Sequence, residues 1–496
     1  MRPIRSLLAV ALGISALACN SSARTSSSPT AYRAYPHGLL GSQCGASDTA
    51  GAPGVGDEYF PNYGNGGYDV QHYELDLRYA PGPNHLRGTA TIQADATQDL
   101  SCFNLDLVGM AVHEVTVAGQ PATFSRSAHE LKITPPAPLG SGDAFVVVVD
   151  YEGTPHTFPV PGITQKAGFV PTRDGAIVAG EPEVAAGWFP VNDHPTDRAT
   201  YTFRVTVPSG YDVVANGLRQ SKTPHDGRTT HVWVANDPMA SYLATVDIGD
   251  WRMRFRRTDS GLPVIDAVDP DMLADSRAAL RREPEILSFL ESQFGPYPFE
   301  TVGAIVTDSR KLGFALETQT RPIYPPDAFP GPGIYYVVHE LAHQWFGDLV
   351  SVDRWQDIWL NEGFATYAEW LWTEHRGFDT TQQTFLDEFR AIPRRSSFWE
   401  VMIGDPGVKN LFHGAVYERG AMTLQALRNQ IGADAFFDVL HQWVQDHAFG
   451  TGTTDAFIEL AEQVSRQQLD DLFQTWLFEP HKPPTGSAGL HALVQS

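Results

Sequence analysis

Residues 337–362 read VVHELAHQWFGDLVSVDRWQDIWLNE, and the rest of the chain is organised around them. His339 and His343 open and close the pattern H-E-x-x-H, and Glu362 follows nineteen positions after His343. Apolar residues around the two histidines recur at helical spacing, and neither Gly nor Pro interrupts residues 334–346. The stretch therefore predicts a helix that carries both histidines.

The spacing of the two histidines predicts a metal site. Residues four apart on a helix lie on one face, one turn apart, so both imidazoles can reach one metal ion at about 2 Å. A catalytic zinc takes three protein ligands and keeps a fourth position open. Glu362 lies on a second predicted helix around residues 360–371 and supplies the third ligand. Glu340 is rotated away from the ligand face and is free to act as a base, so the motif predicts one zinc ion per chain.

Composition limits the classes of protein to consider. The chain has 496 residues, of which 42% are hydrophobic and 19% charged, and this is typical of a globular protein with two or three domains. The formal net charge of −23 argues against nucleic acid and against an anionic membrane surface as partners.

The first residues are typical of an export signal. Arg2 and Arg5 precede an apolar run, Leu7–Ala18, which is too short to span a bilayer and predicts a signal peptide over residues 1–18. Cys19 follows directly, as in a bacterial lipoprotein signal, and predicts a lipid anchor; an ordinary secretion signal is the alternative. We therefore expect an exported protein, either a lipoprotein of the cell envelope (periplasmic or surface) or a secreted protein.

Two cysteines remain if Cys19 carries lipid. Cys44 and Cys102 either form a disulfide in an oxidising compartment or stay unpaired, and both readings remain open. No cysteine lies near the H-E-x-x-H motif, so none is expected to bind the metal.

The patterns along the chain predict an α+β multidomain protein. Alternating apolar and polar residues, as in the run from Tyr73 to Tyr79, predict a β-sandwich or saddle-shaped sheet, and a mostly helical pattern follows it. The predicted segments are a signal peptide (1–18), a Ser- and Gly-rich tether (19–56), a β-domain (57–251), the zinc domain (252–480) with a strand at 302–306, and a tail (481–496).

Several separate segments resemble one family, the aminopeptidase N-like zinc metallopeptidases of the gluzincin clan. The segments that carry the resemblance are HELAHQWFG (339–347) with LNEGFATY (360–367), GFALETQ (313–319), VYERGAM (416–422), GEPE with WFPVNDHP (180–195) and FGPYPF (294–299). The resemblance spans residues 59 to about 480, and it implies a β-domain ahead of a thermolysin-like catalytic domain.

The resemblance implies a role for each matching residue. The implied roles are zinc binding by His339, His343 and Glu362, general base catalysis by Glu340, donation to the developing oxyanion by Tyr417, and binding of the substrate's α-amino group by Glu317 and Glu181. Ala315, in the same motif as Glu317, is a further expected substrate-binding residue. Glu183 lies two positions from Glu181 and is the alternative for that role. Trp345, Trp355, Trp359 and Trp370 are interpreted as core residues, and Glu418 and Arg419 as a solvated helix face.

The chain departs from the family pattern in two places. Phe314 and Thr318 stand where the family's G-A-M-E-N motif has its first Gly and its Asn, and Phe314 bears on the shape of the first side-chain pocket. The sequence ends soon after Trp476, so we expect no large C-terminal helical domain and a more open site.

These observations favour a zinc-dependent aminopeptidase. We expect it to act on peptides with a free N-terminus through metal-activated water, with Glu340 as the base. The alternatives are a zinc endopeptidase or other hydrolase of the same fold, such as an epoxide hydrolase, and a non-catalytic binding module of the envelope.

Overall fold

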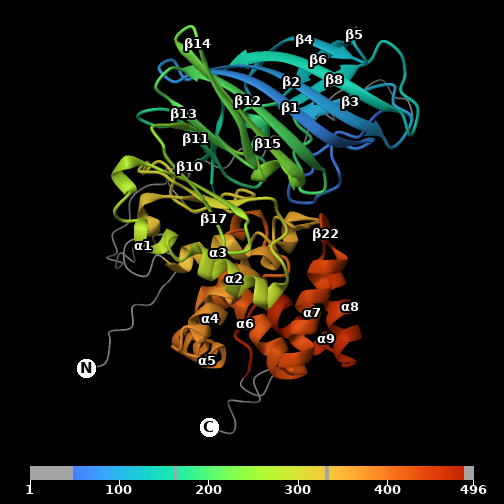
Figure 1. The fold of residues 1–496 in the computed structure, drawn as a ribbon. Coiled ribbons are helices and arrows are strands. Elements are labelled where there is room, and N and C mark those ends of the chain that lie inside the picture. The colour runs from blue at the N-terminus through green and yellow to red at the C-terminus, as the bar shows by residue number, and fades with distance from the viewer. Residues whose placement is uncertain (1–48, 161–164, 330–333, 485–496) are drawn as a thin grey trace, which may run out of the picture.

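The computed structural model describes residues 49–160, 165–329 and 334–484 (Figure 1). The predicted signal peptide, Cys19, Cys44 and most of the predicted tail lie outside these ranges. Within the described ranges, no helix combines the length and the apolar character that crossing a bilayer requires.

The N-terminal half is rich in sheet, and its largest sheet has the strand order β14-β15-β12-β1-β2-β8-β4-β5. In β1, the alternating side chains of Tyr73, Leu75, Leu77 and Tyr79 are buried, as their spacing predicts. The strands of this sheet are β1 (Tyr68–Ala80), β2 (His85–Ala96), β4 (Ala111–Val117), β5 (Gln120–Pro121), β8 (Ala144–Gly153), β12 (Arg198–Pro208), β14 (Leu218–His225) and β15 (Arg228–Ala240). The pairing of β1 with β12 is parallel, whereas β1 and β2 are antiparallel.

Two smaller sheets complete this half, in the orders β3-β7-β6 and β13-β16-β11-β10-β9. Their strands are β3 (Phe103–Asp106), β6 (Thr123–Ser127), β7 (Glu130–Thr134), β9 (Thr157–Pro159), β10 (Lys166–Pro171), β11 (Ala176–Ala179), β13 (Asp212–Ala215) and β16 (Val246–Gly249). Cys102, next to β3, is disulfide-bonded. The backbone around it pairs with the first described residues, because the N–H of Gly51 donates to the carbonyl O of Cys102 at 2.9 Å.

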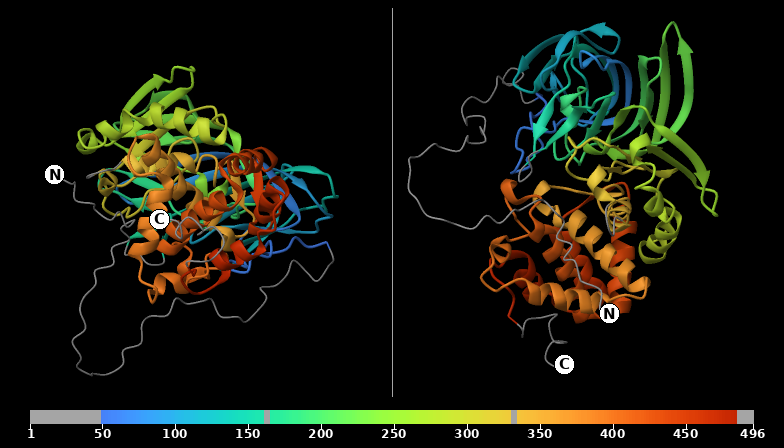
Figure 2. Two further views of the ribbon diagram at one scale, coloured as in Figure 1. Left: turned by 90° about the horizontal axis from the view of Figure 1, so that it is seen from below. Right: turned by 90° about the vertical axis from the view of Figure 1, so that its left-hand side faces the viewer.

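A four-stranded sheet, β17-β18-β19-β20, opens the second half. Its strands are β17 (Arg252–Arg257), β18 (Pro263–Val268), β19 (Val302–Val306) and β20 (Ile323–Tyr324). The sequence predicted β19 alone, since β17 carries four arginines and β20 is only two residues long. Figure 2 shows this sheet between the N-terminal sheets and the C-terminal helices.

Helices make up most of the remainder. They are α1 (Arg277–Leu280), α2 (Glu283–Phe294), α3 (Ile334–Ala342), α4 (Trp359–His375), α5 (Thr381–Ala391), α6 (Gly414–Ile431), α7 (Ala433–Asp446), α8 (Thr454–Ser465) and α9 (Asp470–Phe473). The short strands β21 (Val350–Val352) and β22 (Gly450–Gly452) pair in parallel beside them. The sheet-rich N-terminal part followed by a helical part confirms the predicted fold class.

Two details of the sequence interpretation are wrong. The helix α3 ends at Ala342, so His343 lies one residue past the helix that the sequence predicts to carry both histidines, although its N–H still donates to the carbonyl O of His339 at 3.2 Å. Arg419 is not solvated: its side chain is fully buried. Its guanidinium donates to the backbone carbonyl groups of Trp399, Val401, Thr475 and Glu479. These hydrogen bonds tie helix α6 to two distant backbone segments. Trp345, Trp355, Trp359 and Trp370 are buried, as predicted.

The two halves are joined close to the zinc motif. Arg198, at the start of β12, donates to the carbonyl O of Asp348 and to the hydroxyl of Ser351. The carboxylate of Asp57 accepts a 2.9 Å hydrogen bond from the backbone N–H of Trp355. The loop between α3 and α4 is therefore held from the N-terminal side.

Helices α4 and α6 approach each other through a pair of glycines. A Cβ atom at Gly363 would lie 2.8 Å from the Cα of Gly420, and a Cβ atom at Gly420 would lie 2.7 Å from the Cα of Gly363. Such distances are too short for any side chain, so only glycine permits this crossing. Because Glu362 precedes one glycine and Tyr417 lies one turn before the other, the crossing fixes these two side chains relative to each other.

Candidate metal centre and active site

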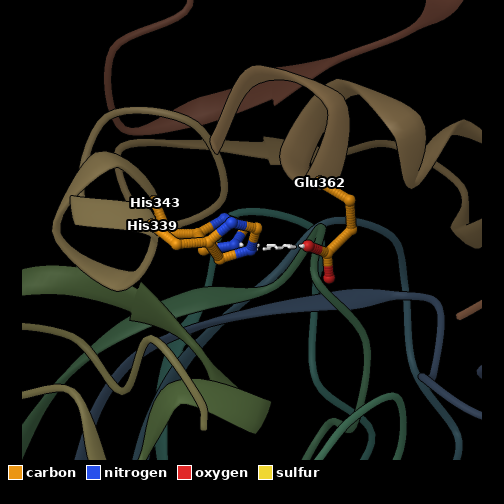
Figure 3. Close-up of side chains that lie close together, drawn as sticks. All are labelled: His339, His343 and Glu362. Atoms are coloured by element: carbon orange, nitrogen blue, oxygen red, sulfur yellow. Dashed lines mark hydrogen bonds and ion pairs between the residues drawn. The ribbon is translucent and has the colours of Figure 1, made fainter. Parts of the chain in front are cut away.

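Three buried side chains converge as the sequence predicts. The Nε2 atoms of His339 and His343 lie 3.1 and 3.4 Å from the same carboxylate oxygen of Glu362 (Figure 3). One ligand atom from each residue lies within 4.8 Å of the others. Tetrahedral ligands at about 2.1 Å from a zinc ion are about 3.4 Å from one another. The donor set and its spacing therefore fit a single zinc ion.

The far nitrogen of each imidazole is held by a hydrogen bond. The Nδ1 atom of His339 lies 2.7 Å from the carboxylate of Glu369, and that of His343 lies 2.9 Å from the carbonyl O of Phe346. Acceptors at both Nδ1 atoms keep the proton there and leave each Nε2 lone pair directed at the metal position. Sequence reasoning missed Glu369. It lies seven residues after Glu362, two turns along the same face of α4, and that spacing is the signal that could have found it.

The carboxylates around the triad favour a positive charge at its centre. Burial lowers the pKa of His343, but Glu317 and Glu362 outweigh this and raise it to about 9. Burial raises the pKa of Glu362, but hydrogen bonds from His339 and His343 outweigh this and lower it to about 2. The carboxylates thus hold positive charge on the imidazoles, and a divalent ion at this position supplies that charge in place of two protons.

Glu340 lies beside the triad rather than in it. Its side chain is buried, and one carboxylate oxygen forms a second group with Glu317 and His343, with atoms within 4.8 Å of one another. Burial raises the pKa of Glu340 to about 8, against the opposing effect of His339 and His343. A carboxylate placed here can both accept and release a proton near neutral pH.

Glu317 reaches the same place from the edge of the four-stranded sheet. Its neighbour Leu316 pairs with Ile323 of β20 through hydrogen bonds of 2.8 and 3.0 Å. The hydroxyl of Tyr242 donates to the Glu317 carboxylate at 3.3 Å, and the amide of Gln344 donates to its carbonyl O at 3.0 Å. Tyr242 and Gln344 thus position Glu317, and neither was found from the sequence because both act only through the folded arrangement. Ala315, two positions before Glu317, is half-buried.

Glu181 and Glu183 have different charged neighbours in the structure. Burial raises the pKa of the Glu181 carboxyl, and the charges of Glu317 and Glu362 raise it further, so these two carboxylates are among the charges near Glu181. Burial also raises the pKa of Glu183, but the charges that act on it are those of Asp193, Asp57 and Asp106 in the N-terminal domain. Glu181 is therefore the one of the two whose carboxyl lies near charges of the candidate site.

Tyr417 of α6 covers the other side of the metal position. Its ring stacks over the imidazole of His339, with ring centroids 6.0 Å apart. Burial and the charge of Glu362 raise the pKa of the Tyr417 phenol well above its usual range, which keeps the hydroxyl protonated and able to donate. The triad, Glu340 and Glu317 thus lie together, and Tyr417 packs on His339 beside them.

Comparison with known proteins agrees with this geometry. Residues 333–476 match the Peptidase family M1 domain, and residues 69–243 match the Peptidase M1 N-terminal domain. The crystal structure of an M1 zinc metallopeptidase from Deinococcus radiodurans superposes with a TM-score of 0.80 and 31% identity, covering 87% of this chain and 98% of that one. The chain belongs to the M1 family of zinc metallopeptidases.

Two curated relatives are longer than this chain. Glutamyl aminopeptidase of Homo sapiens is 25% identical over 335 residues, which are 64% of this chain and 35% of the human protein. Aminopeptidase N of Streptomyces lividans is 25% identical over 439 residues, which are 82% of this chain and 50% of that protein. The chain thus spans about a third to a half of the length of these relatives.

The substitution Glu369→Gln tests the support of the metal centre in this M1 family member. We expect zinc affinity to fall by about 10- to 100-fold, because the amide is a weaker acceptor for the Nδ1–H of His339. Competition with a chromogenic chelator measures the change. Glu459→Gln, on the exposed face of α8, is the matched control and should bind zinc as the wild type does. Equal zinc affinity in Glu369→Gln and the control would show that this hydrogen bond does not support the site.

Proposed function

We propose that the protein is a zinc-dependent aminopeptidase that releases N-terminal residues from peptides. The observation that carries the proposal is a pair of acidic side chains beside the zinc triad. A carboxylate oxygen of Glu317 lies within 4.8 Å of ligand atoms of Glu340 and His343, and the charge of Glu317 in turn raises the pKa of Glu181. An α-ammonium group placed between these carboxylates and the metal would put the first peptide bond of the substrate at the metal. A buried acidic pair of this kind favours removal of one residue over cleavage within a chain.

The relatives support the same reading. Those of human and Streptomyces lividans origin are named glutamyl aminopeptidase and aminopeptidase N. A variant of the Deinococcus radiodurans peptidase, which is 31% identical with a TM-score of 0.79, is described in complex with the substrate Tyr-Ser-Ala. Short peptides with a free amino terminus are accordingly the proposed substrates.

Each catalytic role follows from the position of a side chain. Zinc, when bound by His339, His343 and Glu362, acts as a Lewis acid toward the scissile carbonyl and the attacking water. Glu340 takes the proton of the water and passes it to the leaving amine. The protonated phenol of Tyr417 donates to the carbonyl oxygen as that oxygen gains negative charge.

Export to the cell envelope is part of the proposal. The basic residues and apolar run before Cys19 support a signal peptide, with Cys19 as the lipidated first residue of the mature chain. Mass spectrometry of the mature N-terminus distinguishes a lipidated Cys19 from an ordinary secreted terminus.

The test of the proposed function compares two versions of one fluorogenic aminoacyl substrate, one with a free and one with an acetylated amino group. We expect kcat/KM to be at least about 10³-fold higher for the free amine, because acetylation leaves Glu317 and Glu181 without their cationic partner. Equal rates on both would indicate an endopeptidase or another hydrolase. No turnover in zinc-loaded protein would indicate a binding module.

A further inference from the structure

A second group of metal-binding side chains lies in the N-terminal domain. Asp106, at the end of β3, and His129 and Glu130, at the start of β7, each offer one ligand atom within 4.8 Å of the others. The Nε2 atom of His129 lies 3.8 Å from a carboxylate oxygen of Asp106 and 3.7 Å from one of Glu130. The same nitrogen hydrogen-bonds to the carbonyl O of Asn62 at 2.6 Å, and a metal ion would replace this hydrogen bond. Three candidate ligands from two segments thus converge.

Asp106 is fixed with one oxygen directed at this group. Its side chain is completely buried. The Oδ2 atom accepts hydrogen bonds from the backbone N–H groups of Gly64 and Asp193, at 3.2 and 2.9 Å, and from the side-chain amide of Asn65 at 3.0 Å. The Oδ1 atom is buried and has no hydrogen-bond partner. Three donors on one oxygen hold the other in place, as supporting hydrogen bonds do around metal ligands.

Glu130, like Asp106, has buried carboxylate oxygen without a hydrogen-bond partner. Both of its carboxylate oxygens are buried, and neither has a hydrogen-bond partner. The nearby guanidinium of Arg126 donates to the carbonyl O of Met110 at 2.9 Å and to that of Leu107. Two carboxylates with oxygens this close repel each other when both are charged, and a cation between them removes this repulsion.

We propose that Asp106, His129 and Glu130 form a second metal site, distinct from the catalytic one, that takes a divalent transition-metal ion. An imidazole with two carboxylates favours zinc, manganese or a similar ion over calcium and magnesium, which prefer sets made only of oxygen. The nitrogen–oxygen distances of 3.7 and 3.8 Å are close to the separation of about 3.4 Å that tetrahedral ligands have around zinc.

The position of the site gives the ion a structural role. Asn62 belongs to the segment ahead of β1, and the ring of Tyr63 in that segment stacks face to face on His129 with centroids 4.3 Å apart. The same segment carries Asp57, whose carboxylate accepts from the backbone N–H of Trp355 in the loop after the zinc motif. An ion at the second site would join β3 to β7 and fix the His129 ring on which this segment packs, and would thereby steady a contact between the two halves.

The test measures zinc binding in a background that lacks both catalytic imidazoles, His339→Ala/His343→Ala. The chain is stripped with a chelator and dialysed, Zn²⁺ is added, and bound zinc per chain and melting temperature are measured. We expect one bound zinc and a raised melting temperature in this background. Adding His129→Asn or the near-isosteric Glu130→Gln is expected to abolish both effects.

A matched control separates this site from general surface binding. His113 is an exposed histidine 3.2 Å from the carboxylate of Glu152 in the same domain, so His113→Asn removes a similar pair without touching the proposed site. We expect His113→Asn to keep the bound zinc. The proposal is overturned if the background chain binds no zinc, in which case Asp106 and Glu130 share a proton. It is equally overturned if His129→Asn and Glu130→Gln retain as much zinc as His113→Asn.

Discussion

The substitution Glu340→Gln is expected to lower kcat for an aminoacyl substrate by about 10²- to 10⁴-fold, the usual contribution of a general base. Glutamine keeps the size of the side chain but can neither take the proton of the water nor deliver it to the leaving amine. Glu340 lies beside the triad and is not one of the three ligands, so the zinc content of the purified variant should equal that of the wild type. Steady-state kinetics together with metal analysis separate these two effects.

A control variant and two contrary outcomes make the Glu340→Gln prediction testable. Glu459→Gln on the exposed face of α8 is the matched control, and it should keep the wild-type kcat. Turnover by Glu340→Gln within a factor of a few of that control would remove Glu340 from the mechanism. A loss of zinc in Glu340→Gln would instead assign this residue a structural role at the metal.

The substitution Glu317→Gln is expected to lower kcat/KM for substrates with a free amino group by about 30- to 1,000-fold. This range corresponds to about 2–4 kcal/mol for breaking a buried, hydrogen-bonded charge pair. The reason is local: Glu317 is buried beside the zinc triad and is held there by Tyr242 and Gln344. The value of kcat/KM for the acetylated substrate should change much less. The ratio of kcat/KM for the free amine to that for the acetylated substrate should therefore fall.

Glu183→Gln is the control for amine recognition. Glu183 lies two residues from Glu181, but the charges that act on its carboxyl are those of Asp57, Asp106 and Asp193 in the N-terminal domain. We expect Glu183→Gln to keep the wild-type preference for the free amine and Glu181→Gln to reduce it. A preference that is unchanged in both Glu317→Gln and Glu181→Gln would show that another group recognises the substrate terminus.

The zinc triad could be predicted from the sequence because its geometry is mostly local. His343 follows His339 by four positions, one helical turn, at the end of α3, and helical periodicity alone places Glu362 on the neighbouring helix. The alternation of Tyr73 to Tyr79 likewise gave the central strand β1, since one face of that strand is buried.

The residues that the sequence did not reveal act through tertiary contacts. Tyr242 and Gln344 come from different elements and meet only at Glu317, so no spacing in the chain links them. Arg419 looks like a surface residue, but it is buried, and its two terminal nitrogens donate to four backbone carbonyl groups from distant segments. The crossing of Gly363 with Gly420 also depends on the packing of two helices.

The most direct test of the central claim is an anomalous difference map from crystals of active protein, with data collected at the zinc absorption edge. The account predicts a peak about 2 Å from the Nε2 atoms of His339 and His343 and from the carboxylate of Glu362. Active protein with no anomalous peak between these three side chains would contradict it.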